Sequence, residues 1–313
     1  MRVIVTGGAG FIGSHTVDAL LAGGHEVAII DDLSSGFLEN VDPRAAFHEA
    51  DIRDKALVEK IFDDFRPQAV IHFAAQMDVR VSTRMPDVDA QINIGGTINI
   101  LQSCRAVGVD RVVYSASGGT VYGETAVLPV SEEHSVNPIS PYGITKHTVE
   151  HYLYLYARNF GVTYASLRYP NVFGPRQNPR GEAGVIAIFA RKLLIGEACD
   201  IFGDGSQTRD YVYIADVVRA NLMALNSTRN LLLNIGSGVG RSVTEVYEAV
   251  SRAVGVSIPA RHLPEREGEV AAIALDSIKA ERELGWKPSV SFGEAVSKTV
   301  DSLRILKSEG KLS

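Results

Sequence analysis

A chain of 313 residues is longer than one average domain, and with 45% hydrophobic residues it can bury a sizeable core. The formal net charge of −6, with only 22% charged residues, gives no reason to expect a nucleic-acid or membrane-surface partner. Cys104 and Cys199 are too few for a disulfide framework and lack metal-ligand spacing, so neither a disulfide-rich secreted protein nor a metal site is expected.

The first half of the chain alternates short β-branched runs with amphipathic ones. The sequence predicts a helix over 55–65 and strands at 2–6, 25–30, 68–75, 110–117 and 162–168. The strand runs are apolar at both odd and even positions, as expected when helices cover both faces of a parallel sheet. We therefore expect an α/β fold, with a Rossmann-type doubly wound parallel sheet formed by residues 1–170.

After Pro170 the alternation gives way to "NVFGPRQNPRGEAG", a run rich in Gly, Pro and Asn. Residues 171–313 are expected to form mainly a smaller α/β lobe. Parts of 210–236 read again as strand, helix and strand, and are predicted to rejoin the large sheet. The chain enters its first strand without a basic leader, and no later apolar run is long enough to cross a bilayer, which favours a cytoplasmic protein.

The run "VIVTGGAGFIGSH" follows the first strand directly and opens a helix. Gly7, Gly10 and Gly13 permit a tight turn and the close approach of a pyrophosphate, which the helix N-terminus would bind near Phe11 and Ile12. A glycine-rich turn that binds nothing is the alternative. An acid at the end of the second strand favours the dinucleotide site.

That acid is Asp31, with Asp32 beside it. A carboxylate at this place accepts hydrogen bonds from ribose hydroxyls and repels a 2′-phosphate, so NAD is favoured over NADP. In "EADIRD", Asp51 and Ile52 are predicted near the adenine, with a turn residue as an equal alternative for Asp51. His72, inside the apolar run that ends in "HFAAQ", is predicted to be a core histidine.

A helix is predicted from Pro141 to about Asn159, because Ser140 is a good N-cap, proline suits the first helical position and Gly161 can end the helix. Tyr142 and Lys146 then lie on one face. The lysine charge is expected to lower the pKa of the tyrosine, and an oxidised nicotinamide would add to this effect, giving a base near neutral pH.

By itself, Tyr-x-x-x-Lys is more often packing than chemistry. The dinucleotide turn upstream favours chemistry, as does "YSASGGTVYG" at the end of the fifth strand, where the ligand crevice of an open α/β sheet lies. Ser117 in that run can bond a substrate hydroxyl. Ser115 is the alternative serine.

These motifs, with "DDLSSG", "HFAAQ", Asn93-Ile-Gly-Gly-Thr, "RYPNVFGPRQ" and "TRDYVYIADV", resemble in order the extended short-chain dehydrogenase/reductase superfamily, and within it the UDP-glucose 4-epimerase family. The resemblance implies a tightly held NAD, a catalytic trio of Ser117, Tyr142 and Lys146, and a homodimer formed by the helices after Ala90 and Pro141. The predicted cofactor-binding residues are Gly7, Gly10, Phe11, Ile12, Gly13, Asp31, Asp32, Ser35, Gly36, Asp51, Ile52, Phe73, Ala74, Ala75, Gln76, Asn93, Ser115, Tyr142, Lys146 and Tyr169.

The second lobe offers groups for a nucleoside diphosphate. Arg209 and Arg266 are planar forks suited to phosphate oxygens, and Asn171 adds a neutral donor. Each could instead be a surface or loop residue, and Tyr211 is equally plausible as core. By resemblance, Glu269 would contact the ribose. The predicted substrate-binding residues are Ser117, Tyr142, Asn171, Val185, Ile186, Arg209, Tyr211, Arg266 and Glu269, with Val185 and Ile186 contributing backbone groups to the uridine pocket.

The activity implied is NAD-dependent epimerisation of a UDP-hexose at carbon 4, between UDP-galactose and UDP-glucose, through a transient 4-keto sugar. An epimerase of a UDP-N-acetylhexosamine or UDP-uronic acid, and a non-catalytic dinucleotide-binding sensor, are the alternatives. A dehydratase is disfavoured, because "SASGGTVYG" has no acid pair beside the serine. Two departures bear on the substrate. Met77 stands where some epimerases carry a lysine, with Arg80 as a candidate substitute, and Ile273 falls near the position that gates N-acetyl sugars.

Overall fold

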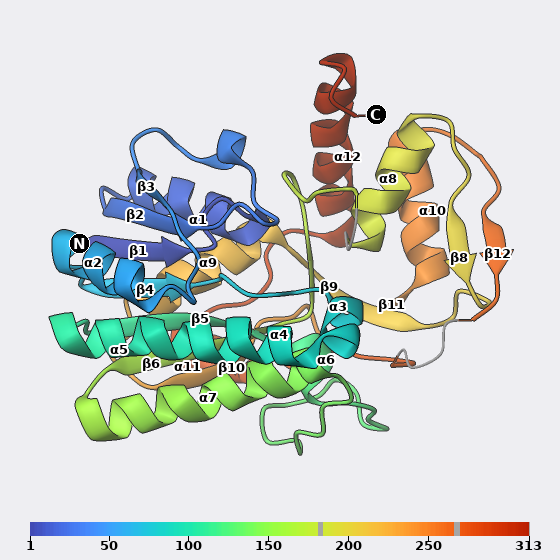
Figure 1. Ribbon diagram of the computed structural model, residues 1–313. Coiled ribbons are helices and arrows are strands. Elements are labelled where there is room, and N and C mark those ends of the chain that lie inside the picture. The colour runs from blue at the N-terminus through green and yellow to red at the C-terminus, as the bar shows by residue number, and fades with distance from the viewer. Residues whose placement is uncertain (181–183, 266–269, 313) are drawn as a thin grey trace.

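The computed structural model describes residues 1–180, 184–265 and 270–312, and its centre is a seven-stranded sheet with the order β10-β6-β5-β4-β1-β2-β3 (Figure 1). Every pairing between neighbouring strands is parallel. The strands are β1 (Arg2–Thr6), β2 (Glu26–Asp31), β3 (Ala46–Glu49), β4 (Ala69–His72), β5 (Arg111–Ser117), β6 (Thr163–Tyr169) and β10 (Leu231–Asn234). The order reverses between β1 and β4, which places a ligand crevice at the carboxyl ends of these two strands.

Helices cover both faces of this sheet, which confirms the predicted doubly wound fold. One face packs against α1 (Phe11–Ala22), α9 (Ile214–Leu225) and α11 (Ile278–Leu284), and the other against α2 (Lys55–Phe65), α5 (Thr97–Val107) and α7 (Pro141–Phe160). Alternate strand residues feed the two cores: Val3, Val5 and Ile29 the first, Ile4 and Ile30 the second. Each such fully buried side chain stabilises the fold by about 1.5–3 kcal/mol.

A second group of elements lies beside the sheet, on the right in Figure 1. It contains a three-stranded sheet of β7 (Asn171–Phe173), β9 (Thr208–Tyr213) and β11 (Gly240–Ser242), and a pair of β8 (Asp200–Phe202) with β12 (Arg261–Leu263). Their core is shared with α8 (Val185–Leu194), α10 (Val243–Val254) and α12 (Phe292–Ser308). Of the segment 210–236, α9 and β10 join the large sheet, whereas β9 stays with the second group.

Short helices lie along the carboxyl edge of the large sheet. They are the 3₁₀ turn Leu38–Asn40, α3 (Val79–Arg84), α4 (Pro86–Ala90), a π-helical stretch Gln91–Gly96 that runs into α5, and α6 (Gly118–Val121). π-helical turns occur often at functional sites, because the wider turn frees backbone groups and re-aims side chains. In the described ranges no helix is long and apolar enough to span a bilayer.

The helix that carries Tyr142 and Lys146 is fixed at both ends by local signals. The Ser140 hydroxyl accepts the Gly143 N–H at 3.1 Å, and Pro141 fills the first helical position. A cap of this kind contributes about 1 kcal/mol. Gly161 ends the helix with φ of 78° in the left-handed region. The predicted boundaries are thus confirmed, with the end one residue later than expected, at Phe160.

Candidate functional site

The glycine-rich turn leaves bare backbone between β1 and α1. Gly7 has φ of +69°, and a Cβ there would lie 2.7 Å from the Ala74 nitrogen, while a Cβ at Gly13 would lie 2.1 Å from the Gly7 carbonyl oxygen. Gly10 is the N-cap of α1 and offers no side-chain cap, so the N–H groups of the first turn, at Phe11 and Ile12, have no side-chain partner there. Such an end is suited to a pyrophosphate. The turn therefore fits the dinucleotide that its sequence predicts.

Asp31 ends β2 beside this turn, and its carboxylate accepts the backbone N–H groups of Ala9 and Leu33, each at 2.9 Å. Burial raises the pKa of Asp31, while these two hydrogen bonds oppose the rise. A Cβ at Gly36 would lie 3.0 Å from the Asp31 Oδ1 atom, so the loop of Ser35 and Gly36 lies directly against the acid. The carboxylate has lone pairs left for ribose hydroxyls. The neighbouring Asp32 binds the Ser34 backbone and hydroxyl.

Asp51 and Ile52, the two residues predicted near the adenine, have different surroundings. The Asp51 carboxylate accepts the Arg53 backbone N–H at 2.8 Å and pairs with the Arg53 guanidinium, which lowers the pKa of Asp51. These contacts match the turn-residue alternative, and an adenine contact stays a prediction. Ile52 is buried, and its side chain would collide with a Cβ at Gly96.

The segment after β4 contacts the carboxyl end of β1 and the glycine-rich turn. Thr6 accepts the Phe73 N–H at its carbonyl and the Ala74 N–H at its hydroxyl. His72 is buried and bonded through both ring nitrogens, to Thr6 at 2.6 Å and Thr97 at 2.9 Å, which confirms the prediction of a core histidine. Ala75 and Gln76 follow at the crevice, and the Gln76 N–H binds the Asn93 side chain at 2.8 Å.

The catalytic trio predicted by resemblance comes together at the end of β5. The Ser117 side chain lies close enough to the Tyr142 hydroxyl to lower the pKa of the tyrosine, and its oxygen accepts the Thr120 hydroxyl at 2.8 Å. The Lys146 ammonium lies 5.7 Å from the Tyr142 ring centroid and donates to the Ser115 carbonyl at 2.9 Å. Ser115 thus contacts Lys146 through its backbone, whereas Ser117 is the serine that reaches the tyrosine.

Burial dominates the electrostatics of this trio. Burial raises the pKa of Tyr142. The Ser117 side chain acts in the opposite direction, and the Asp89 carboxylate raises the pKa of Tyr142 further. Burial lowers the pKa of Lys146 to about 8, against the raising effect of Asp89. The protein's own groups therefore do not bring Tyr142 to the expected pKa near neutral pH, because removing the phenolate from water costs more than these groups return.

Asn93 and its neighbours form a polar cluster behind the trio. The Asn93 amide donates to the Gln76 carbonyl, Asp89 and Thr145, each at 3.1 Å. Asp89 and Thr145 were not among the predicted site residues. Nothing in the sequence marks them, because they meet only through the packing of α4 and the π-helical stretch against α7. Tyr169, predicted at the cofactor, donates its hydroxyl to Asn221 at 2.8 Å, which leaves its ring or backbone for such a contact.

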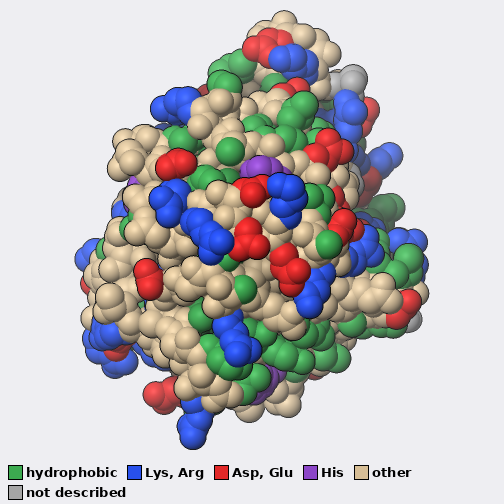
Figure 2. Space-filling model, turned by 60° about the vertical axis from the view of Figure 1, so that its left-hand side comes forward, with side chains coloured by type: hydrophobic (Ala, Val, Ile, Leu, Met, Phe, Trp, Pro, Cys, Tyr) green, Lys and Arg blue, Asp and Glu red, His purple; other side chains and the backbone are tan. Residues whose placement is uncertain are grey.

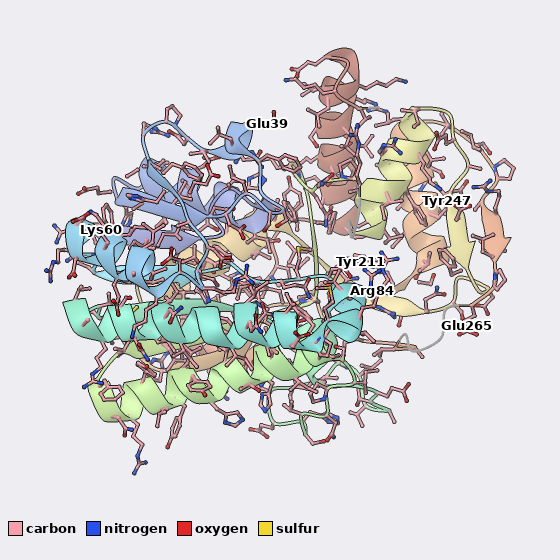
Figure 3. All side chains as sticks on the ribbon, viewed as in Figure 1. Glu39, Lys60, Arg84, Tyr211, Tyr247 and Glu265 are labelled. Carbon is pink, nitrogen blue, oxygen red and sulfur yellow. The ribbon has the colours of Figure 1, made fainter. Side chains whose placement is uncertain are left out.

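A cavity of about 550 Å³ opens in the second group of elements. Four predicted substrate-binding residues are in its lining, namely Asn171, Val185, Arg209 and Tyr211, whereas Ile186 is fully buried in the core behind it. Tyr211 lies between the large sheet and the second group (Figure 3), and it is both a core and a lining residue. Burial raises the pKa of Tyr211 to about 12, against the lowering effects of Arg209 and of the Asn171 side chain.

The cavity and the trio are neighbours, because a Cβ at Gly119, two residues after Ser117, would lie 3.9 Å from the Asn171 side chain. Gln177, Lys192 and Gln207 also line the cavity and were not predicted. Lys192 is ion-paired with Asp200 at 2.6 Å. Arg266 and Glu269, two further predicted contacts, lie outside the described residues.

Three positions bear on the choice of sugar. Met77 is exposed, and Arg80 follows it in α3, where its N–H binds Asp78. Ile273 is buried in a small cluster with Val121 of α6. Their roles toward a substrate stay predictions.

Comparisons with known proteins agree with this geometry. The profile of the NAD dependent epimerase/dehydratase family matches residues 3–236. A putative UDP-glucose 4-epimerase of Methanocaldococcus jannaschii is 50% identical over 96% of this chain and 98% of its own length.

Two solved structures are similar over nearly their whole length. The UDP-glucose 4-epimerase of Thermotoga maritima with UDP-glucose has a TM-score of 0.97 and 45% identity, covering 98% of this chain and 100% of that one. The Thermus thermophilus UDP-glucose 4-epimerase in complex with NAD has a TM-score of 0.93 and 44% identity, covering 97% and 99%. With the dinucleotide turn, the Tyr142–Lys146 helix and the family match in agreement, this chain belongs to the NAD-dependent epimerase/dehydratase family.

Proposed function

We propose that this protein is an NAD-dependent UDP-glucose 4-epimerase, which interconverts UDP-galactose and UDP-glucose through a transient 4-keto sugar. The observation that carries the proposal is the meeting of Ser117, Tyr142 and Lys146 at the carboxyl edge of the sheet, between the dinucleotide turn and the cavity of Arg209. Bound NAD supplies the reversible acceptor of the hydride from carbon 4 and a positive charge beside the tyrosine.

The chain's own residues move the proton. Tyr142 accepts the proton of the sugar's 4-hydroxyl as the hydride leaves carbon 4, and it returns that proton when the hydride comes back to the opposite face. Ser117, which lies beside the Tyr142 hydroxyl, is proposed to bridge the tyrosine and the sugar oxygen. Lys146 contributes positive charge that favours the phenolate, which the burial of Tyr142 otherwise disfavours.

Inversion at carbon 4 requires the hexose to present both of its faces to the cofactor. The protein must therefore hold the substrate by its nucleotide. Arg209 and Asn171 are proposed to hold the diphosphate, and the α8 N-terminus at Val185 offers N–H groups to the same ligand. Tyr211 lines the same cavity beside Asn171 and is proposed to orient that amide. Arg266 and Glu269 are proposed to contact the nucleotide as well.

We also propose a homodimer formed through α5 and α7. Apolar side chains lie exposed on α7, among them Ile144, Tyr154, Leu155 and Phe160. Figure 2 shows hydrophobic side chains gathered in the lower part of the face it presents, near the level of α5 and α7 in Figure 1. Such a patch is typical of a protein interface. Sedimentation velocity would test it, with a dimer expected for the wild type and a monomer for Leu155→Asp.

A cytoplasmic location is proposed in line with the two buried free thiols, Cys104 and Cys199.

The activity is tested by incubating the purified protein with UDP-galactose, without added cofactor, and following the sugar by proton NMR. Conversion to an equilibrium mixture with UDP-glucose is expected. If NAD is found bound but neither UDP-hexose reacts, the UDP-N-acetylhexosamines and UDP-uronic acids become the substrates to assay, and the proposed hexose specificity fails.

A further inference from the structure

Asp89 is a carboxylate with no exposed surface beside the helix of Tyr142 and Lys146. Its Oδ1 atom accepts the side-chain amides of Gln76 at 2.9 Å and Asn93 at 3.1 Å, and its Oδ2 atom accepts the Thr145 hydroxyl at 2.7 Å. All three donors are neutral. Within the described ranges no lysine or arginine lies within ion-pair distance of this carboxylate, although a buried ion without a partner costs several kcal/mol.

Other buried aspartates of the chain have a plainer role. Asp210 is also fully buried, but it accepts the backbone N–H groups of Ser237, Gly238 and Leu275 and so holds loops together. Asp89 accepts only from side chains, and these come from three separate segments at the site. Its cost is therefore not offset by fixing a backbone turn.

The three segments each contribute to the proposed chemistry. Gln76 ends the cofactor-side run after β4, Asn93 lies in the π-helical stretch, and Thr145 lies on α7 between Tyr142 and Lys146. The Thr145 oxygen also lies 3.0 Å from the Tyr142 carbonyl and accepts the Asn93 amide at 3.1 Å. The carboxylate thus ties the first turns of α7 to the cofactor side of the crevice.

Lys146, like Asp89, is a buried charged residue of this site, with 3% of its surface exposed. From β5, the Tyr114 ring centroid lies 4.9 Å from the ammonium, and from β4, His72 has its pKa lowered to about 3 by burial and by Lys146. On α7 itself, Tyr142 faces the lysine, and Glu150 is paired with Arg168.

Asp89 is thus a buried anion that has no arginine or lysine within ion-pair distance in the part of the chain that the structure describes. Its charge acts on Lys146 against the desolvation that burial imposes. It also acts on Tyr142, so it opposes the phenolate while it supports the ammonium. A neutral substitution at Asp89 would remove both its effect on Lys146 and its effect on Tyr142.

We propose that Asp89 is a positioning residue for proton transfer at carbon 4. Its carboxylate fixes Thr145, and with it the placement of Tyr142 and Lys146, and its negative charge keeps Lys146 an ammonium ion at working pH. This inference rests on the proposed function for its kinetic readout, but the charge state of Lys146 can be measured without any turnover.

The test compares Asp89→Asn, which keeps the shape and removes the charge, with Thr145→Val, which keeps the charge and removes the hydroxyl. For Asp89→Asn we expect kcat to fall about tenfold or more, because one buried charge interaction is lost. The alkaline limb of its kcat profile should move to lower pH, while KM for the UDP sugar stays the same. Thr145→Val should lower kcat and leave the alkaline limb at its wild-type pH.

The direct readout is the titration of Lys146, followed by NMR of protein with ¹³C-labelled lysine and assigned with Lys146→Met. The pKa of Lys146 should be lower in Asp89→Asn than in the wild type, and it should keep its wild-type value in Thr145→Val. An unchanged Lys146 titration and an unmoved alkaline limb in folded Asp89→Asn would overturn the inference. If that variant does not fold, Asp89→Ser, which leaves room for water beside Gln76 and Asn93, carries the same expectation. A wild type that does not epimerise UDP-hexoses refutes the proposed function, while the lysine titration still decides the role of Asp89.

Discussion

Tyr142 is the residue on which the proposed chemistry depends most directly, because its hydroxyl is the proposed base and lies beside Ser117 at the crevice. Tyr142→Phe removes that hydroxyl and keeps the ring, so turnover is expected to fall by roughly 10²–10⁴-fold with the fold intact, the usual scale for losing a general base. Tyr152→Phe, on the same helix but away from Ser117, serves as the control. Near-normal turnover of Tyr142→Phe, with unchanged circular dichroism, would remove this residue from the mechanism.

We propose that Asp31 decides the choice between NAD and NADP. Its buried carboxylate lies against Gly36, so a 2′-phosphate at the ribose would meet both a negative charge and a closed loop. We expect the denatured protein to release NAD and no NADP, as measured by chromatography with enzymatic cycling. Asp31→Asn should lose this preference, whereas Asp51→Asn, whose acid is held by Arg53, should keep it. Release of NADP from the wild type would refute the ribose assignment.

At the scale of elements, α7 is tied to the sheet by a buried ion pair as well as by its apolar face. Glu150 accepts Ser166 at 2.8 Å and the Arg168 guanidinium at 2.9 and 2.5 Å. Burial would raise the pKa of Glu150, but the hydrogen bonds from Arg168, His147 and Ser166 bring it down to about 2. The folded-state pKa is thus depressed, so this stabilisation is present above the unfolded pKa near 4.5 and is lost as the pH falls toward about 2.

Glu150→Gln should therefore destabilise the protein by about 3–5 kcal/mol at pH 7, because Arg168 is left buried without its anion. The difference from wild type should shrink as the pH falls below about 4.5, where the wild-type pair begins to lose its advantage. Urea unfolding at fixed protein concentration measures both, with the exposed Glu294→Gln as control. A destabilisation that stays constant down to about pH 3 would contradict the role given to the pair.

How much of these elements the sequence predicts depends on where the signal lies. The ends of α7 follow from Ser140, Pro141 and Gly161, which act within one turn, and the strands follow from apolar runs. The dinucleotide turn is equally local. The cluster of Asp89 and Thr145 could not be predicted, because the two residues are 56 positions apart and meet only when α4 packs on α7. The rise that burial causes in the pKa of Tyr142 could not be predicted either, since the spacing to Lys146 is visible in the sequence but the burial is not.

At the scale of the whole molecule, the two groups of elements are interlocked by the path of the chain. β9 belongs to the second group and leads directly into α9 and β10 of the large sheet. Asp216 on α9 then accepts the N–H groups of Ser289 and Val290, just before α12 of the second group. This interlocking argues that the molecule unfolds in one cooperative transition.

UDP offers a test, because its proposed cavity lies in the second group while the single tryptophan, Trp286, lies buried in a core of the large sheet. Saturation at about 100 times Kd stabilises the native state by about 2.7 kcal/mol. If unfolding is cooperative, UDP should raise the midpoint followed by Trp286 fluorescence by several degrees. Arg209→Ala should abolish the rise at the same UDP concentration, whereas Arg252→Ala, an exposed residue of α10, should not. If calorimetry detects bound UDP but the Trp286 midpoint does not change, the second group of elements unfolds separately from the large sheet. If the midpoint still rises in Arg209→Ala, that arginine does not hold the diphosphate.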